Sequence, residues 1–228
     1  MSMMSGISAG YKRWTTMAID IVPALLVRHK HLLEEGLIKL HGVSPWVQVD
    51  FVDRNYLLGE ETFPQWKEFN FEVDLMTDDQ MRDAEAAVAL GAARVVVHAH
   101  RDALKALEVL QKYRAGDFPV EVGIALHPDD APDTLATFAG LYDYVQVMGI
   151  AQEGSQGQPA DERAVALIRT LRQAHPEVLI QVDGAVAERV TELVRAGATR
   201  LIVGGAIVNA DNPKAVYKSL YTEANGAQ

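Results

Sequence analysis

Short apolar runs alternate with longer amphipathic segments along the chain from about residue 18. Eight of these runs are rich in β-branched residues, as expected of buried strands. They cover residues 19–22, 46–49, 71–75, 94–97, 120–124, 144–148, 179–182 and 201–203. The segments between them carry helical spacing; Leu167, Ile168 and Leu171, for example, fall on one face of a helix. Strictly alternating strands and helices predict parallel strands joined by right-handed crossovers.

Eight such units in 228 residues favour a closed barrel over an open doubly wound sheet. The predicted fold class is α/β, a single (β/α)8 TIM barrel over residues 17–228, preceded by an N-terminal extension at residues 1–16. Two similar segments around Gly91 and Gly197 agree with a barrel of two related halves, although a common helix-to-strand joint explains them equally well. Residues 50–71 leave room for only a short helix at 63–69, and the loop 53–61 has the character of an active-site flap.

The composition of the chain excludes cysteine chemistry and argues against several classes of binding partner. The chain has no cysteine, which excludes disulfides, thiolate metal sites and cysteine nucleophiles. A net charge of −10 argues against nucleic acid and anionic membranes as partners. No apolar run reaches the roughly 18 residues of a membrane span, and residues 1–16 lack the apolar centre of a secretory signal. We expect a soluble, cytoplasmic protein.

Three carboxylates follow directly from predicted strands. In barrels of this type the reactive groups stand at the C-terminal ends of the strands. Asp50, Asp74 and Asp183 occupy such ends on three different strands, so they are expected to converge at the mouth. Converging carboxylates bind a hard cation, transfer protons or cap nearby backbone, and the pattern leaves these alternatives open.

Glycines after the last strands indicate a phosphate site. Gly204 and Gly205 follow the eighth strand, and Gly184 follows the seventh, where such barrels hold phosphate with backbone N–H groups. The loop that contains Gly154, Gly157 and Gln158 could close over the same phosphate or be a plain flexible connection.

The histidines carry a weaker signal. His98 ends the fourth strand and is a candidate site residue, while His100 and His127 begin loops on the same rim. No pair has the H-E-x-x-H spacing of a zinc protease.

Taken together in order and spacing, the strand ends resemble ribulose-phosphate 3-epimerases from about residue 20 to residue 220. The runs that carry the likeness are Val49-Asp50-Phe51-Val52-Asp53, Val73-Asp74-Leu75-Met76, Val147-Met148, Gln181-Val182-Asp183-Gly184 and Val203-Gly204-Gly205-Ala206-Ile207. The resemblance implies that Asp50 and Asp183 are the paired catalytic acid and base, acting on opposite faces of the substrate. It also implies that Met76 and Met148 line the site, and that a divalent metal is held by two aspartates and two histidines.

The chain departs from the family where the metal is bound. Gln48 and Asp74 stand at the two positions where the family has histidines, and Ala24 replaces a family serine. The resulting set of Gln48, Asp50, Asp74 and Asp183 offers only oxygen ligands, which favours magnesium or manganese over zinc. The other interpretation is that the metal has been lost.

Three functions are consistent with these residues. The first is an isomerase that inverts C3 of D-ribulose 5-phosphate or a close ketose phosphate, giving D-xylulose 5-phosphate or its analogue. The second is a diverged, metal-free phosphosugar-binding barrel without turnover. The third is a decarboxylase or aldolase of the same superfamily; Met76 stands where those enzymes have a lysine, which weighs against it. A sugar phosphate is the expected small-molecule partner in each case, and a homo-oligomer is compatible with the exposed helical faces.

Overall fold

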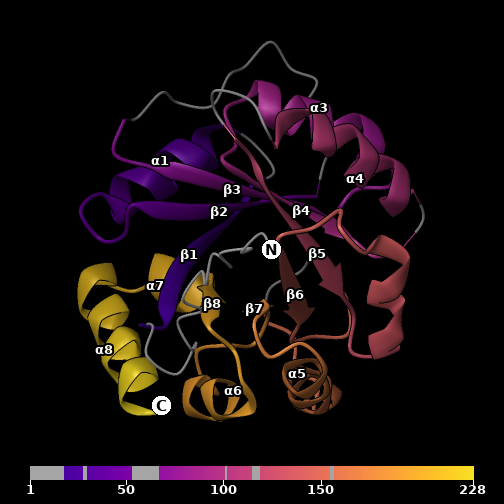
Figure 1. Ribbon diagram of the computed structural model, residues 1–228. Helices are drawn as coiled ribbons and strands as arrows, with labels where there is room; N and C mark the ends of the chain where they lie inside the picture. The colour runs from indigo at the N-terminus through magenta and orange to yellow at the C-terminus, as the bar shows by residue number, and fades with distance from the viewer. Residues whose placement is uncertain (1–17, 28–29, 53–66, 101, 115–118, 155–156) are drawn as a thin grey trace, which may run out of the picture.

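Eight parallel strands form a closed barrel in the computed structural model (Figure 1). The structure describes residues 18–27, 30–52, 67–100, 102–114, 119–154 and 157–228. The strands follow one another around the barrel in chain order, and β1 pairs with both β2 and β8. They are β1 Asp20–Val27, β2 Trp46–Phe51, β3 Asn70–Leu75, β4 Arg94–His98, β5 Glu121–Leu126, β6 Tyr144–Met148, β7 Leu179–Asp183 and β8 Arg200–Val203. The predicted (β/α)8 fold is confirmed.

Helices surround the barrel and connect successive strands (Figure 1). They are α1 Lys30–Leu40, α3 Gln80–Ala89, α4 Ala103–Leu110, η2 Gln111–Tyr113, η3 Pro132–Phe138, α5 Arg163–Ala174, α6 Val190–Ala196, α7 Gly205–Val208 and α8 Pro213–Gly226. The connection from β5 to β6 is the 3-10 helix η3 instead of an α-helix.

The structure describes only part of the segment between β2 and β3, and it shows how α8 begins. Residues 67–69 form a turn and an irregular segment, whereas the rest of the predicted helix 63–69 and the predicted flap 53–61 lie outside the described residues. The side chain of Asn212 caps α8 by accepting a hydrogen bond from the Ala215 N–H at 3.0 Å.

The strands have an apolar outer face and a polar inner face. In β2, Val47 and Val49 belong to the large core between the strands and the helices, while Gln48 and Asp50 point into the barrel. Period-two alternation sends successive side chains to opposite faces, so one strand serves both environments. Packing beneath the helices therefore stabilises the barrel, and the interior is left available for chemistry.

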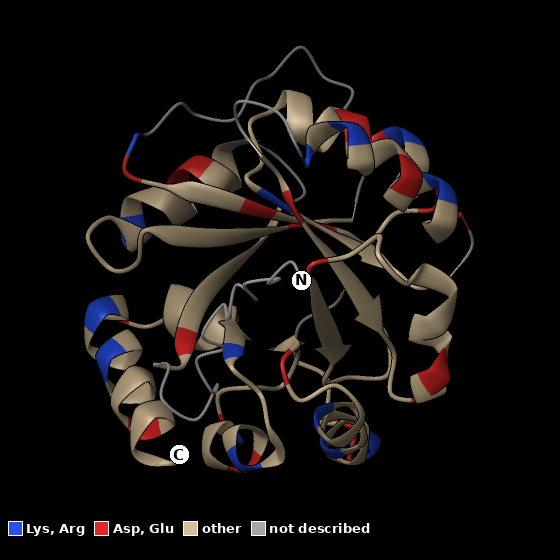
Figure 2. Cartoon of the chain, viewed as in Figure 1, with Lys and Arg blue, Asp and Glu red and all other residues tan. Residues whose placement is uncertain are grey.

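Charged residues fill the bottom of the barrel. Figure 2 shows acidic positions on the central strands as well as on the outer helices. Glu72 lies 3.8 Å from Arg94 and 3.7 Å from Arg200, and it accepts hydrogen bonds from Tyr144 and Gln181 at 3.0 and 2.6 Å. A fully buried carboxylate needs such partners, because an unpaired charge in the interior costs several kcal/mol. This paired floor supports the polar groups above it.

No helix in the described part of the chain is long and apolar enough to cross a bilayer.

Candidate active site at the barrel mouth

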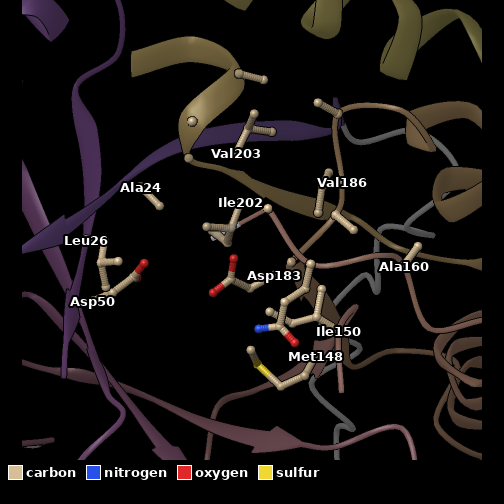
Figure 3. Close-up of a pocket in the computed structure, with 18 of the residues that line it drawn as sticks. Ala24, Leu26, Asp50, Met148, Ile150, Ala160, Asp183, Val186, Ile202 and Val203 are labelled. Carbon is tan, nitrogen blue, oxygen red and sulfur yellow. The ribbon is translucent and has the colours of Figure 1, made fainter. Parts of the chain in front are cut away.

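A cavity of about 610 Å³ opens at the C-terminal ends of the strands (Figure 3). Most of the residues that the sequence predicts for the site line it. These are Asp50, Met76, Met148, Gly154, Gly157, Gln158, Asp183, Gly184, Gly204 and Gly205. The lining does not include Gln48, Asp74 or His98, which are fully buried.

Close backbone approach shapes one wall of this cavity. Gly184 has φ +98°, a conformation that other residues adopt only with strain. A Cβ atom at Gly149 would meet the Gly184 carbonyl oxygen at 2.0 Å, and the Gly149 N–H donates to the Asp183 carbonyl at 2.6 Å. The two glycines thus let the chain after β6 lie against the end of β7 beside the Asp183 side chain. Gly184 was predicted from the sequence as a site residue, whereas Gly149 was not, because its contacts are with residues far along the chain.

Asp50, Asp74 and Asp183 converge as expected from their strand ends. One carboxylate oxygen of each lies within 4.8 Å of the others. Asp50 and Asp183, from β2 and β7, point toward each other in the cavity, with Leu26 beside Asp50 and Ile202 beside Asp183 (Figure 3).

Burial and mutual repulsion perturb two of these acids. Burial, followed by the charges of Asp183 and Asp74, holds the pKa of Asp50 well above its ordinary value. Burial and the charge of Asp74 likewise raise the pKa of Asp183 to about 7. Hydrogen bonds from Gln48 oppose both shifts: the amide nitrogen of Gln48 donates to Asp50 at 2.7 Å and to Asp183 at 3.1 Å. Both acids therefore keep their protons to higher pH than an isolated aspartate does.

Asp74 is tied to the interior of the barrel instead of the cavity. One of its oxygens accepts a hydrogen bond from Gln146 at 2.7 Å, and the other lies 2.8 Å from Nε2 of His98. Burial lowers the pKa of His98, but the charge and hydrogen bond of Asp74, together with Glu153, raise it overall to about 10. Although the sequence suggests His98 as a substrate contact, the structure places it beneath the cavity as the partner of Asp74.

Two groups of described residues have the composition of a metal site. The first is Asp50, Asp74 and Asp183, whose carboxylate oxygens suit a hard cation such as magnesium or manganese. Gln48 was predicted as a fourth ligand, but it presents its amide nitrogen, a donor, to Asp50 and Asp183. The second group is His98, His100, His127 and Glu153 on the neighbouring part of the rim. Glu153 carries no motif and was not recognised from the sequence.

Gln146 and Gln181, which support the aspartates together with Gln48, were also missed. Gln181 donates to Gln146 at 2.6 Å and to Gln48 at 3.3 Å, which connects the amides beneath the three acids. A signal for them does exist in the sequence: Gln48, Gln146 and Gln181 are each the third residue of a strand whose neighbouring positions are apolar. A polar residue at an alternate position of a buried strand indicates a polar interior network.

The opposite end of the cavity is suited to an anion. Gly204, Gly205 and Ala206 bring backbone to the cavity at the start of α7, where the first N–H groups have no partner within the helix. Arg189, the one basic residue among the described lining residues, lies 2.8 Å from Glu192 and 3.0 Å from Glu162. Backbone N–H groups at the start of α7 can therefore donate to a phosphate here, while Arg189 is paired with carboxylates.

A parallel eight-stranded barrel with acidic side chains and glycine turns at its mouth belongs to the phosphate-binding (β/α)8 class of enzymes. The family model of the ribulose-phosphate 3 epimerase family matches residues 20–208, and the chain belongs to that family. The resemblance recognised from the strand ends is thus confirmed. Membership indicates an enzyme of the ribulose-phosphate-binding barrel superfamily.

Individual relatives agree with this assignment. The chain is 26% identical to ribulose-phosphate 3-epimerase from Schizosaccharomyces pombe, over 91% of this chain and 95% of the relative. In fold it is similar to a 3-hexulose-6-phosphate synthase (TM-score 0.67, 19% identity, 90% of this chain and 99% of that one). It is also similar to KGPDC from Streptococcus mutans (TM-score 0.68, 13% identity, 92% and 98%). At these identities the structural likeness supports the fold alone.

Proposed function

We propose that the chain inverts C3 of a ketose phosphate, D-ribulose 5-phosphate or a close analogue, by proton transfer between two aspartates. One observation carries this proposal: Asp50 and Asp183 face each other across a cavity whose far end is a glycine turn suited to phosphate (Figure 3). Epimerisation needs a group on each face of the reacting carbon, and two strands on different sides of the cavity supply them.

Binding and proton transfer use different parts of the cavity. The phosphate lies against the backbone of Gly204, Gly205 and Gly184, which leaves the carbonyl end of the sugar between the two acids. One aspartate removes the C3 proton, and the electron pair of the C–H bond moves into an enediolate. The other aspartate donates a proton to the opposite face of C3, and the carbonyl re-forms with inverted configuration. The two acids exchange protonation states in one turnover.

The protonation states of the pair suit this exchange. A general acid must hold a proton near neutral pH, and the pKa of Asp183, raised to about 7, meets that need, while the pKa of Asp50 is raised in the same direction. Gln48 hydrogen-bonds to both carboxylates and so positions them. Asp50, Asp74 and Asp183 would hold a divalent cation, magnesium or manganese, which supplies a Lewis acid for the negative charge of the enediolate.

The lining of the cavity disfavours the decarboxylase or aldolase alternative. Met76 occupies the position of the lysine that those enzymes use, and the described lining residues include no lysine. A carbanion formed by loss of carbon dioxide would lack its proton donor.

The experiment follows the C3 hydrogen directly. The chelator-treated chain is reloaded with magnesium, manganese or zinc in separate samples and mixed with D-ribulose 5-phosphate in deuterium oxide. Proton NMR then measures formation of the epimer and replacement of the C3 hydrogen by deuterium. We expect both with the unmodified chain. Asp50→Asn and Asp183→Asn should each slow epimer formation by about 10³-fold. The variant that keeps the aspartate acting as base on this substrate should still replace the C3 hydrogen by deuterium, without inverting C3.

Asp211→Asn is the matched control, because Asp211 is exposed and distant in sequence from the aspartates of the site. It should behave as the unmodified chain. Absence of both epimer and deuterium exchange with every metal, from protein that still binds the sugar phosphate, would contradict the proposal and favour a binding barrel without turnover.

A further inference from the structure

Three histidines and a glutamate converge beside the cavity, on the side formed by β4, β5 and β6. His98 ends β4, and His100 follows two positions later. His127 stands directly after β5, and Glu153 lies in the connection that follows β6. Each pair of imidazole rings has its centroids 5.4 to 5.6 Å apart, so the three rings surround a common centre.

The donor atoms have the spacing of a coordination sphere. Nδ1 of His98 lies 3.2 Å from Nε2 of His127 and 3.2 Å from a carboxylate oxygen of Glu153. Nε2 of His100 lies 3.3 Å from the other oxygen of Glu153, and Nε2 of His127 lies 2.6 Å from the first. Tetrahedral bonds of about 2.0 Å place ligand atoms about 3.3 Å apart. The separations of Nδ1 of His98 from His127 and from Glu153 are close to this value, and one donor atom of each of the four residues lies within 4.8 Å of the others.

Hydrogen bonds alone leave this cluster incompletely satisfied. Oε2 of Glu153 is buried and, although two ring nitrogens lie near it, neither contact has hydrogen-bond geometry among the described residues. Two ring nitrogens, of His98 and His127, also face each other, and at most one of them can donate to the other. A cation bound at this point would pair with all four groups at once and displace the ring protons directed at it.

Neighbouring residues hold the ligands in place. Nε2 of His98 lies 2.8 Å from Asp74, which leaves Nδ1 directed at the cluster. A carboxylate on the far nitrogen of a ligating histidine is the usual support of such a ligand, because it sets the tautomer and the ring orientation. Gln80 bonds to the backbone N–H and carbonyl of His98 at 2.6 and 3.0 Å. Asp130 accepts from the His127 N–H at 2.7 Å.

We propose that His98, His100, His127 and Glu153 form a second metal site, which binds a divalent transition ion of the zinc class. Three imidazole nitrogens and one carboxylate oxygen are the ligands that zinc and cobalt prefer, and magnesium does not. The site is accessible, because 33% of the His100 side chain and 22% of the Glu153 side chain are exposed. It shares no ligand with the three aspartates and does not depend on the proposed function.

Metal binding would connect three loops at the rim. Glu153 directly precedes Gly154, which lines the cavity, so a metal bound to Glu153 would anchor that wall to β4 and β5. Because four protein ligands complete a tetrahedral zinc site, the ion has a structural role here, with no position kept open for substrate.

Cobalt provides the test, because four-coordinate cobalt has strong visible absorption bands. The untagged full chain is stripped with chelator and titrated with cobalt chloride, and zinc chloride is then added to displace the cobalt. We expect one equivalent of four-coordinate cobalt, displaced by one equivalent of zinc. His127→Asn and Glu153→Gln should each weaken cobalt binding at least about 100-fold.

Two controls separate the candidate sites. His175→Asn changes an exposed histidine at the end of α5, and Asp50→Asn changes the aspartate group; both should keep the cobalt spectrum. His100→Asn, at the most exposed ligand, guards against loss through misfolding, and circular dichroism confirms the fold of each variant. The proposal is overturned if no stoichiometric cobalt binds, if the histidine variants bind as the unmodified chain does, or if Asp50→Asn abolishes binding.

Discussion

The mouth of the barrel has an aspartate side and a histidine side. Both lie at the C-terminal ends of strands, but they differ in burial and in charge. Asp50, Asp74 and Asp183 come from β2, β3 and β7, are buried, and repel one another. The histidine side comes from β4 to β6, is partly exposed, and collects groups of opposite charge around Glu153. Neighbouring carboxylates raise one another's pKa, which suits them to proton transfer. Groups of opposite charge attract one another, which fixes their positions.

The contact between Asp74 and His98 joins the two sides. Asp74 lies near Asp50 and Asp183, while His98 lies near His127 and Glu153. One rim thus carries two groups of different chemistry that meet at a single buried ion pair.

Catalysis should depend on the aspartate side alone. Asp183→Asn is expected to lower kcat/KM for D-ribulose 5-phosphate by about 10³-fold, because it removes one of the two proton-transfer groups. His127→Asn should lower it by less than about tenfold. Steady-state kinetics with a coupled assay for the epimer measures both. A comparable loss in both variants would remove the proposed distinction between the two sides.

Removing the shared residue should destabilise the fold. Asp74→Ala leaves His98 without its buried counter-charge and Gln146 without its acceptor, so the free energy of unfolding should fall by about 3 kcal/mol. Urea denaturation of the metal-free protein measures it. Asp129→Ala, at an exposed position, is the control and should change stability by less than about 0.5 kcal/mol. A loss no greater than that of the control would mean that the pair does not connect the two sides.

Removing a charge from the aspartate side should stabilise the protein at high pH, unlike the destabilising Asp74→Ala. The folded-state pKa of Asp183, about 7, lies above its unfolded value. Its contribution to stability is therefore present below about pH 4 and is lost as the pH rises through 7. Asp183→Asn should make the metal-free protein more stable than the unmodified chain at pH 8, by on the order of 2 kcal/mol, and less so at pH 5. Urea denaturation in chelator at both pH values, with Asp211→Asn beside it, checks the sign. Equal differences at the two pH values would contradict it.

The smallest effect concerns the amide between the two acids. Gln48→Leu removes the donor that bonds to Asp50 and Asp183 and should lower kcat about tenfold through poorer positioning. Its pH profile should shift toward higher pH, because the hydrogen bonds that lower the pKa of both acids are lost. Cobalt binding at the histidine side should not change. An unaltered pH profile would leave Gln48 a merely structural role.

Much of the barrel could be predicted because its information is local. Alternation of apolar strands and amphipathic helices requires only neighbouring residues, and it led to the eight strands and the parallel fold. The strand ends likewise identified Asp50 and Asp183 in the cavity, since a parallel barrel brings all of these ends to one rim. The 3-10 helix η3 was not anticipated, because its short apolar segment fits either helix type.

The sequence by itself determined which residues stand at the rim, and only the tertiary structure decided which of them meet. His98, His100 and His127 were visible as rim histidines, but nothing near Glu153 in the chain indicated that they would surround it. The same limit applies to Gln48, whose amide could offer either oxygen or nitrogen until Gln181 and the two aspartates fixed its hydrogen bonds. Strand register assigns a side chain to the barrel interior, whereas its partner there comes from distant strands and depends on how the barrel closes.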